Sequence, residues 1–308
     1  MTIDEITKQV DKVDSEIDYW FVRTDYGKYF DEFIENKCIA IGWDYLTLYE
    51  LRKITEDVIK KKMALFEEID ISTFGGKVKI STAYNKIQTF LSLKKDDIII
   101  IPSRNSERIA FGRITDEEAF EDFNKKEFVK RRNVEWYNVK YMEDLNPIFY
   151  QVKSNQHTIS NVNHYSPHID RVIGNLFKKG ENTHYVLKID KTDDINFDEL
   201  IILMDNIKTL IQNINREFEF NENIDEVYIK INLQSKGALE LIKKGKSLAV
   251  LAYIIFLTSC NMGVHENDEK IKKFLHDNRQ VLDQTSYVID SLRMNTNELI
   301  KPFNKNGN

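Results

Sequence analysis

Aromatic and cationic side chains gather at the ends of two predicted strands near the start of the chain. Residues 19–24 and 38–42 are rich in aromatic and β-branched residues, which is typical of strands. The first strand runs into a polar turn that carries Tyr26 and Lys28, and the second is followed by Trp43. If the two strands lie side by side, aromatic faces and a cation meet at one edge. That chemistry stacks a flat base and neutralises a phosphate.

The loop at residues 103–106 offers further donors for such a site. It follows the apolar run 98–101 and Pro102, and it leads into another predicted strand. A pocket that reads a base needs one or two aromatic walls and a few donors directed at the base edge. We predict Tyr26, Trp43 and Tyr45 as walls, and Lys28, Ser103 and Arg104 as donors and phosphate contacts. The competing interpretation is that the tryptophans are ordinary core residues.

A cluster of cations later in the chain is the best candidate for contacts to a nucleic-acid backbone. Its members are Lys125, Lys126, Lys130, Arg131 and Arg132. The formal net charge of the whole chain is −6, which argues against a protein that binds nucleic acid by bulk charge. The cluster is either a local phosphate contact or a solvated loop face.

Hydrophobic periodicity places these residues on a mixed set of elements. Helices are predicted at 46–69, 80–93, 198–214 and 247–264, and within 268–300. Strands are predicted at 19–24, 38–42, 98–101, 108–114, 133–141, 184–189 and 227–233. The fold class is therefore α+β.

Length and composition favour two domains in a soluble protein. The chain has 308 residues, of which 42% are hydrophobic and 31% charged. The polar stretch 178–182 is the best boundary, giving domains at 1–180 and 181–308. Cys38 and Cys260 each lie in an apolar run, as buried free thiols do in a reducing cytoplasm. The charged N-terminus has no secretory signal, so we expect a cytoplasmic protein.

An uncharged apolar run at 247–264 allows two interpretations. Its length is at the lower limit for a membrane span, and lysines precede it. Ser259, Asn261 and Gly263 crowd its far end, which shortens the hydrocarbon stretch. We predict a buried central helix of the second domain, with a membrane-directed effector as the alternative.

The order of motifs in the first half resembles the PUA-like domains, including the EVE and ASCH groups, and most closely the version at the N-terminus of Mrr-type restriction proteins. The motifs are Trp20-Phe21-Val22-Arg23, Gly27-Lys28-Tyr29, Ala40-Ile41-Gly42-Trp43, Asp96-Asp97-Ile98-Ile99, Phe111-Gly112-Arg113-Ile114-Thr115, Arg132-Asn133-Val134-Glu135-Trp136 and Gln156-His157-Thr158-Ile159-Ser160. The resemblance covers residues 15–178. It implies a small bent β-barrel with flanking helices, a fold that often reads modified bases in DNA or RNA. It does not imply catalysis.

Mrr-type proteins usually carry a nuclease domain after the reader, so the resemblance raises the question of a nuclease site in the second half. Gln234 and Lys236 end a predicted strand and Asp225 precedes it, which is a poor match to a PD-(D/E)xK site. Such a site would need magnesium held by converging carboxylates. Gly245-Lys246-Ser247 is similar to the end of a phosphate-binding loop, but Glu240 stands where the first glycine of that motif is required.

The leading hypothesis is a prokaryotic defence protein that binds a modified base or nucleotide and needs no cofactor. Its second domain, a small α/β unit around the apolar helix, would couple binding to an effector protein or to homo-oligomerisation. An Mrr-type restriction nuclease is the main alternative. The sequence favours a protein that is not an enzyme.

Overall fold

The computed structural model describes residues 3–13, 16–154, 157–191, 193–232, 237–259 and 269–296. The chain forms two compact units. Residues Ile17–Ile173 make one, called here the central unit. Met1–Glu16 and Gly174–Asn308 together make the other, called here the terminal unit. The expected boundary at 180 thus lies close to the observed division, but the first sixteen residues belong with the C-terminal part of the chain.

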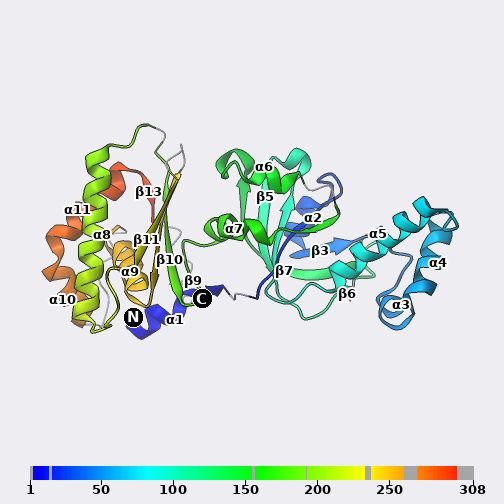
Figure 1. Cartoon of the computed structure of the whole chain (residues 1–308), viewed down its shortest axis with the longest axis horizontal. Coiled ribbons are helices and arrows are strands. Elements are labelled where there is room, and N and C mark those ends of the chain that lie inside the picture. The colour runs from blue at the N-terminus through cyan, green and yellow to red at the C-terminus, as the bar shows by residue number, and fades with distance from the viewer. Residues whose placement is uncertain are drawn as a thin grey trace. The chain divides into compact units, whose positions relative to one another are not determined.

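The central unit is built on a seven-stranded sheet that curls into a half-barrel (Figure 1). The strand order is β3-β7-β5-β4-β2-β8, and β6 pairs with β7. Its strands are β2 (Tyr19–Val22), β3 (Cys38–Ile41), β4 (Ile98–Pro102), β5 (Arg108–Ile114), β6 (Phe120–Glu121), β7 (Lys130–Tyr141) and β8 (Ile159–Asn161). Strands β2 and β4 are parallel, whereas the other pairs are antiparallel.

The continuous apolar run of β4 reflects a strand that is covered on both faces. Ile99 and Ile101 lie in one hydrophobic core, and Ile98 and Ile100 lie in another. Because side chains alternate across a strand, a strand between two cores needs apolar residues at every position. The flanking helices are α2 (Phe30–Glu35), α3 (Leu48–Lys53), α4 (Glu56–Phe66), α5 (Phe74–Leu91), α6 (Phe149–Lys153) and α7 (Ser166–Ile173), with 3₁₀ turns at Arg104–Ser106, Met142–Asp144 and Asn163–Tyr165.

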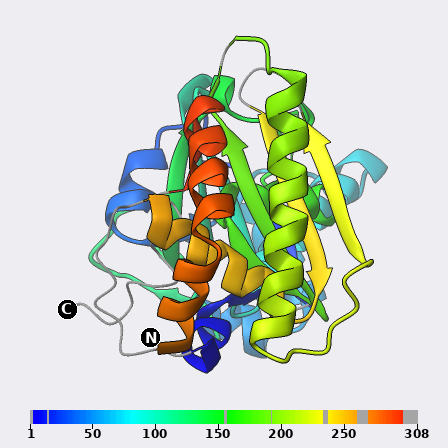
Figure 2. The ribbon, with the colours of Figure 1, turned by 90° about the vertical axis from the view of Figure 1, so that its left-hand side faces the viewer.

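The terminal unit places its helices over a second sheet, of order β1-β9-β10-β12-β11 with β13 on β10 (Figure 2). The strands are β1 (Asp11–Val13), β9 (Leu176–Lys179), β10 (Asn182–Ile189), β11 (Val227–Asn232), β12 (Gly237–Lys244) and β13 (Met294–Asn295). The helices are α1 (Ile3–Gln9), α8 (Phe197–Glu217), α9 (Ser247–Ser259), α10 (Glu269–Asp277) and α11 (Arg279–Ser291). The parallel pairing of β1 with β9, and the burial of Ile6 in the same core as α9, bring the N-terminus into this unit.

Helix α9 lies in the middle of the terminal unit's core. Every residue from Ser247 to Leu257 is buried, against α8, α11, β10 and β12 among others. A helix that is apolar all round requires such enclosure. The last five residues of the predicted helix, 260–264, lie outside the described residues. Among the helices that the structure describes, none is both long and apolar enough to span a bilayer.

Candidate functional site

Parallel pairing of β2 with β4 brings two loops together at one edge of the central sheet. Tyr19, Trp20 and Phe21 pair in register with Ile98, Ile99 and Ile100. Since parallel strands end at the same edge, the residues that follow β2 meet the residues that follow β4. These segments are 23–27 and 102–106, and they are called here the β2 loop and the β4 loop.

A pocket of about 350 Å³ lies between the two loops. It is lined by Arg23, Thr24, Tyr26, Gly27, Pro102, Ser103, Arg104, Asn105 and Ser106. Its volume is at the lower end of the range for small-molecule sites. Three of the six predicted ligand residues, Tyr26, Ser103 and Arg104, therefore do line one pocket. Sequence reasoning did not assign Arg23, Thr24 or Gly27 to it, because their part depends on which strand pairs with β2.

Both loops hold residues in the left-handed region of backbone conformation. In the β2 loop, Asp25, Tyr26 and Gly27 have φ of 49°, 54° and 90°. In the β4 loop, Asn105 and Ser106 both have φ of 56°. Non-glycine residues adopt such angles at a cost of about 1–3 kcal/mol each, and they cluster at ligand sites where the surrounding structure holds them. Residues with positive φ also occur elsewhere, for example at Lys37 and Phe128, but five of them lie together in these two loops beside the pocket.

Gly27 is the point at which the two loops touch. A Cβ atom at this position would lie 2.1 Å from the backbone nitrogen of Arg104 and 2.3 Å from its Cα. Only glycine allows this approach and also accepts φ of 90° without strain. Thr24 ties the loops a second time, because its buried hydroxyl donates to the carbonyl oxygen of Pro102 at 2.6 Å. The pocket wall is therefore fixed from both sides.

The residues that line the pocket carry one aromatic ring, two guanidinium groups, three aliphatic hydroxyls and one side-chain amide. The Tyr26 side chain is 94% exposed. Within the described part of the chain, the Arg104 guanidinium has no hydrogen bond or ion pair, while Arg23 donates to the carbonyl of Lys153 at 3.0 Å. Ser103 is buried, and its Oγ accepts from the backbone N–H of Arg108 at 2.8 Å. An exposed ring and an unpaired cation on strained loops are free to contact a ligand.

The other predicted ligand residues lie outside this lining. Strand β2 pairs with β4 and β8 whereas β3 pairs with β7, so the expected edge formed by β2 and β3 does not exist. Lys28 donates to the Tyr29 hydroxyl at 2.7 Å and to Glu127 at 3.3 Å, and these bonds raise its pKa. Tyr45 stacks on Phe66 with ring centroids 4.5 Å apart. The Trp43 ring packs against the central core.

Most of the basic cluster proves to be internal, which removes it as a phosphate-binding surface. Lys130, Arg131 and Arg132 are all buried at the start of β7. Lys130 Nζ donates to the carbonyls of Trp43 and Leu46 at 2.9 and 3.0 Å, and burial lowers its pKa. The sequence prediction was wrong here because each cation meets an acceptor far away in the sequence.

The partners of the remaining cations follow the same pattern. Arg131 pairs with Glu32 at 2.8 Å, and Arg132 pairs with Asp116 at 2.6 Å. Lys125 forms an ion pair with Glu32 at 3.2 Å, and Lys126 is exposed. Only these two lysines remain at the surface of the predicted cluster.

The weak nuclease candidates are not assembled into a site in the described residues. Asp225 is exposed in the loop before β11, and Gln234 and Lys236 lie outside the described residues. Within the described ranges, no group of three His, Cys, Asp or Glu side chains is placed to hold a metal ion.

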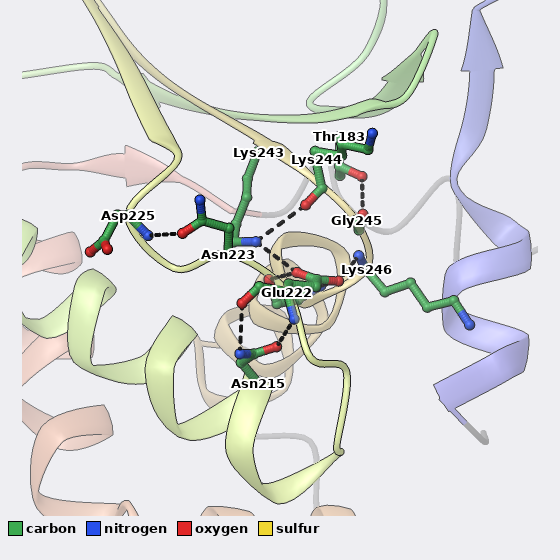
Figure 3. Close-up of polar contacts among 10 residues, drawn as sticks. Thr183, Asn215, Glu222, Asn223, Asp225, Lys243, Lys244, Gly245 and Lys246 are labelled. Atoms are coloured by element: carbon green, nitrogen blue, oxygen red, sulfur yellow. Dashed lines mark hydrogen bonds and ion pairs between the residues drawn. The ribbon is translucent and has the colours of Figure 1, made fainter.

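The Gly245-Lys246-Ser247 segment holds a carboxylate of the protein itself (Figure 3). Glu222 accepts hydrogen bonds from Lys243 Nζ at 2.8 Å, from Ser247 Oγ at 2.5 Å and from the backbone N–H of Lys246. Burial raises the pKa of Glu222, but these bonds outweigh it and bring the pKa below its usual value. The first turn of α9 is thus satisfied internally, as a helix N-terminus favours an anion. This arrangement serves the core rather than a phosphate ligand.

Residues 20–163 match one family model, described as Domain of unknown function (DUF8426). The match lies entirely within the central unit and includes both pocket loops. The search of the curated proteins and the search of the solved structures each returned no match.

Proposed function

We propose that the central unit is a PUA-like reader of nucleic acid that holds one base, or a free nucleotide, in the pocket between the β2 and β4 loops. The base stacks on Tyr26, and the guanidinium groups of Arg23 and Arg104 take the phosphate. The β4 loop supplies donors for the base edge. The observation that carries this proposal is the pocket itself, with its exposed aromatic ring and with an Arg104 guanidinium that has no partner among the described residues, both on two strained loops.

The chemistry of the lining supports a base with a phosphate over other small ligands. Aromatic rings stack on bases with little sequence preference, at about 1–3 kcal/mol per base. The planar guanidinium group of arginine can bind a phosphate through two parallel hydrogen bonds, that is, in a bidentate manner. An acidic chain needs such local cations, because its overall charge of −6 repels nucleic acid. The resemblance of the sequence to PUA-like readers supports the same ligand class.

The proposed setting is prokaryotic defence, in which a reader distinguishes modified from unmodified nucleic acid. The terminal unit would couple binding to an effector protein or to self-assembly, in the cytoplasm and without a cofactor. This part of the proposal rests on the resemblance to the N-terminal domain of Mrr-type restriction proteins.

Fluorescence polarisation with labelled twelve-base single-stranded DNA and RNA, with and without 5-methylcytosine, tests the proposal. We expect Tyr26→Ala with Arg104→Ala to weaken binding by roughly tenfold or more, since stacking alone contributes about 1–3 kcal/mol. Tyr49→Ala is the matched control, because Tyr49 is an exposed tyrosine of the same unit away from the pocket lining.

A second comparison distinguishes this pocket from the edge that sequence alone suggested. Lys28→Ala should leave binding unchanged, because Lys28 is paired with Tyr29 and Glu127 and lies outside the lining. Equal affinity of the wild type and the Tyr26/Arg104 variant would refute the pocket assignment. If binding were lost in Lys28→Ala alone, the binding site would have to lie nearer to β3 than the pocket does.

A further inference from the structure

Strand β11 is an edge strand of the terminal sheet that exposes apolar side chains. Among the described residues it pairs only with β12. Tyr228, Ile229 and Ile231 are 64%, 42% and 48% exposed. An unpaired edge presents a row of free N–H and C=O groups, and natural proteins usually shorten or cover such edges. The exposure of three large apolar residues on a six-residue edge therefore indicates a surface that another strand covers.

Exposed residues of α8 extend this surface on the helix side of the sheet. Ile229 and Ile231 lie directly opposite Leu241 and Leu239 of the neighbouring strand β12. These two leucines face the helix-covered core, so the two isoleucines lie on the same face of the sheet. Phe197 and Ile201 of α8 are also exposed.

Helical spacing places these two residues on the β11 side of α8. Asn215 lies about five helical turns from Phe197 and therefore on the same flank of the helix. It bonds to Glu222, in the loop that leads to β11. The opposite flank, at Glu199 and Asn213, contacts Ser291 of α11 and Asn278. Apolar residues of β11 and of α8 thus border the same edge of the sheet. Figure 2 shows α8 beside this edge.

We propose that β11 pairs antiparallel with β11 of a second copy about a two-fold axis at Tyr228. In this register Glu226 lies opposite Lys230 of the other copy, and the pair occurs twice. Val227 lies opposite the other copy's Ile229, also twice, and the two Tyr228 rings meet on the axis. The inference stands on the terminal unit alone and does not depend on the pocket.

The charge pattern selects this register over its neighbours. A two-fold axis perpendicular to the sheet brings residues of the same face opposite one another, and an axis at Tyr228 pairs the acidic residue with the basic one. An axis at Ile229 would set Tyr228 against Lys230 and leave Glu226 opposite Asn232. An axis at Lys230 would bring two like charges together, which is unfavourable for directly opposed residues.

The same axis places the helices of both copies on one side of the joined sheet. Ile229 and Ile231 of each copy, with Phe197 and Ile201, then form one apolar seam. A closed, self-complementary contact of this kind gives a dimer and leaves no further β11 edge for fibre growth. Strand pairing supplies the main-chain bonds, and the side chains supply the specificity.

Charge reversal tests the register by sedimentation velocity across a range of concentrations. Glu226→Lys and Lys230→Glu each create two like-charge pairs in the dimer, and each should weaken it by about tenfold. The double variant Glu226→Lys/Lys230→Glu should regain the wild-type dissociation constant. A mixture of the two single variants should form a mixed dimer tighter than either variant alone, because both of its pairs are opposite in charge.

Cross-linking provides a readout that does not depend on affinity. Tyr228→Cys places two thiols opposite each other with their Cα atoms about 4.5–5.5 Å apart, which is within the range for a disulfide. Glu226→Cys is the matched control, because its thiol lies about 13 Å along the strand from its counterpart. We expect an oxidised covalent dimer for the first variant and none for the second. A wild-type chain with a dissociation constant weaker than about 1 mM, or equal cross-linking of both variants, would overturn the proposal.

Discussion

Replacement of Glu222 by Gln would test how the buried helix α9 is fixed in the terminal unit. Glu222 and Lys243 have side-chain exposures of 11% and 1%, and their charged atoms lie 2.8 Å apart. Glutamine keeps the size of the side chain but removes its charge. Lys243 would then lose its carboxylate partner, and the carbonyl of Lys244, at 3.2 Å, would be the only one of its present acceptors left unchanged. The donors at Lys246 and Ser247 would face a weaker acceptor.

The expected loss of stability is about 3 kcal/mol, the lower end of the cost of breaking a buried ion pair. The lower end applies because Glu222 keeps some contact with solvent. Most domains have a total stability of about 5–15 kcal/mol, so this loss would shift the denaturation midpoint clearly. Glu181→Gln is the matched control. Glu181 pairs with Lys244, which is on the same strand as Lys243, but the side chains of Glu181 and Lys244 are both exposed. We expect no shift of the midpoint for that variant.

The distribution of tryptophan allows the two units to be followed separately in urea. Trp20, Trp43 and Trp136 are the chain's three tryptophans, and all lie in the central unit. Tryptophan fluorescence therefore reports on the central unit, while far-UV circular dichroism reports on both. Glu222→Gln should lower the midpoint of the dichroism transition and leave the fluorescence transition in place. An unchanged dichroism transition would refute the assigned role of Glu222.

The pH dependence gives a second check with a defined sign. Because the folded-state pKa of Glu222 lies below its usual value, its stabilisation is fully present above the unfolded pKa of about 4.3. The stabilisation is lost as the pH falls through the lower, folded-state pKa. The difference between the wild type and Glu222→Gln should therefore shrink in acid below about pH 4.3. A difference that stays constant through that range would contradict the reasoning.

Three further substitutions address the loops, the core and the buried cations. Gly27→Ala should weaken binding of the oligonucleotide probe, since its Cβ would separate the two pocket loops, and polarisation measures this. Ala252→Asp should unfold the terminal unit by burying an unpaired charge in α9, seen as lost dichroism with intact tryptophan fluorescence. Lys130→Met should leave probe affinity unchanged but destabilise the central unit by about 1–3 kcal/mol, as two carbonyls lose their donor. A Lys130→Met variant that folds normally but no longer binds the probe would restore this lysine as a ligand contact.

Local sequence patterns were sufficient to find the parts of the candidate site but not its arrangement. The apolar run of β4 and the polar loop after it are visible because a strand between two cores has a distinctive composition. The polar turn that contains Gly27 is likewise predicted by local residue types, whereas its left-handed backbone is seen only in the structure. The pairing of β2 with β4, however, joins residues almost eighty positions apart, and no local signal specifies it. Trp43 was assigned to the site on the assumption of a neighbouring strand that the sheet does not provide.

The buried cations show a second kind of limit. Lys130, Arg131 and Arg132 read as a surface cluster because such residues are almost never fully buried unless they are paired. Their partners Asp44, Glu32 and Asp116 come from three separate places in the chain. Strand β12 was missed for a related reason. Lys243, near the end of this strand, obscures its pattern in the sequence. Leu239 and Leu241, two residues apart, both point into the core.

The pocket and the β11 edge together predict how binding should depend on ligand length. A dimer joined at β11 carries two pockets, so a nucleic acid that reaches both gains affinity from the high effective concentration of the second site. A mononucleotide occupies one pocket at a time and gains nothing. Glu226→Lys, which weakens the proposed dimer without touching the pocket lining, should lower affinity for a long oligonucleotide and leave that for a mononucleotide unchanged. An equal loss of affinity for both ligands would mean that Glu226 affects the pocket itself. Unchanged affinity for both ligands would mean that nucleic-acid binding does not depend on the dimer.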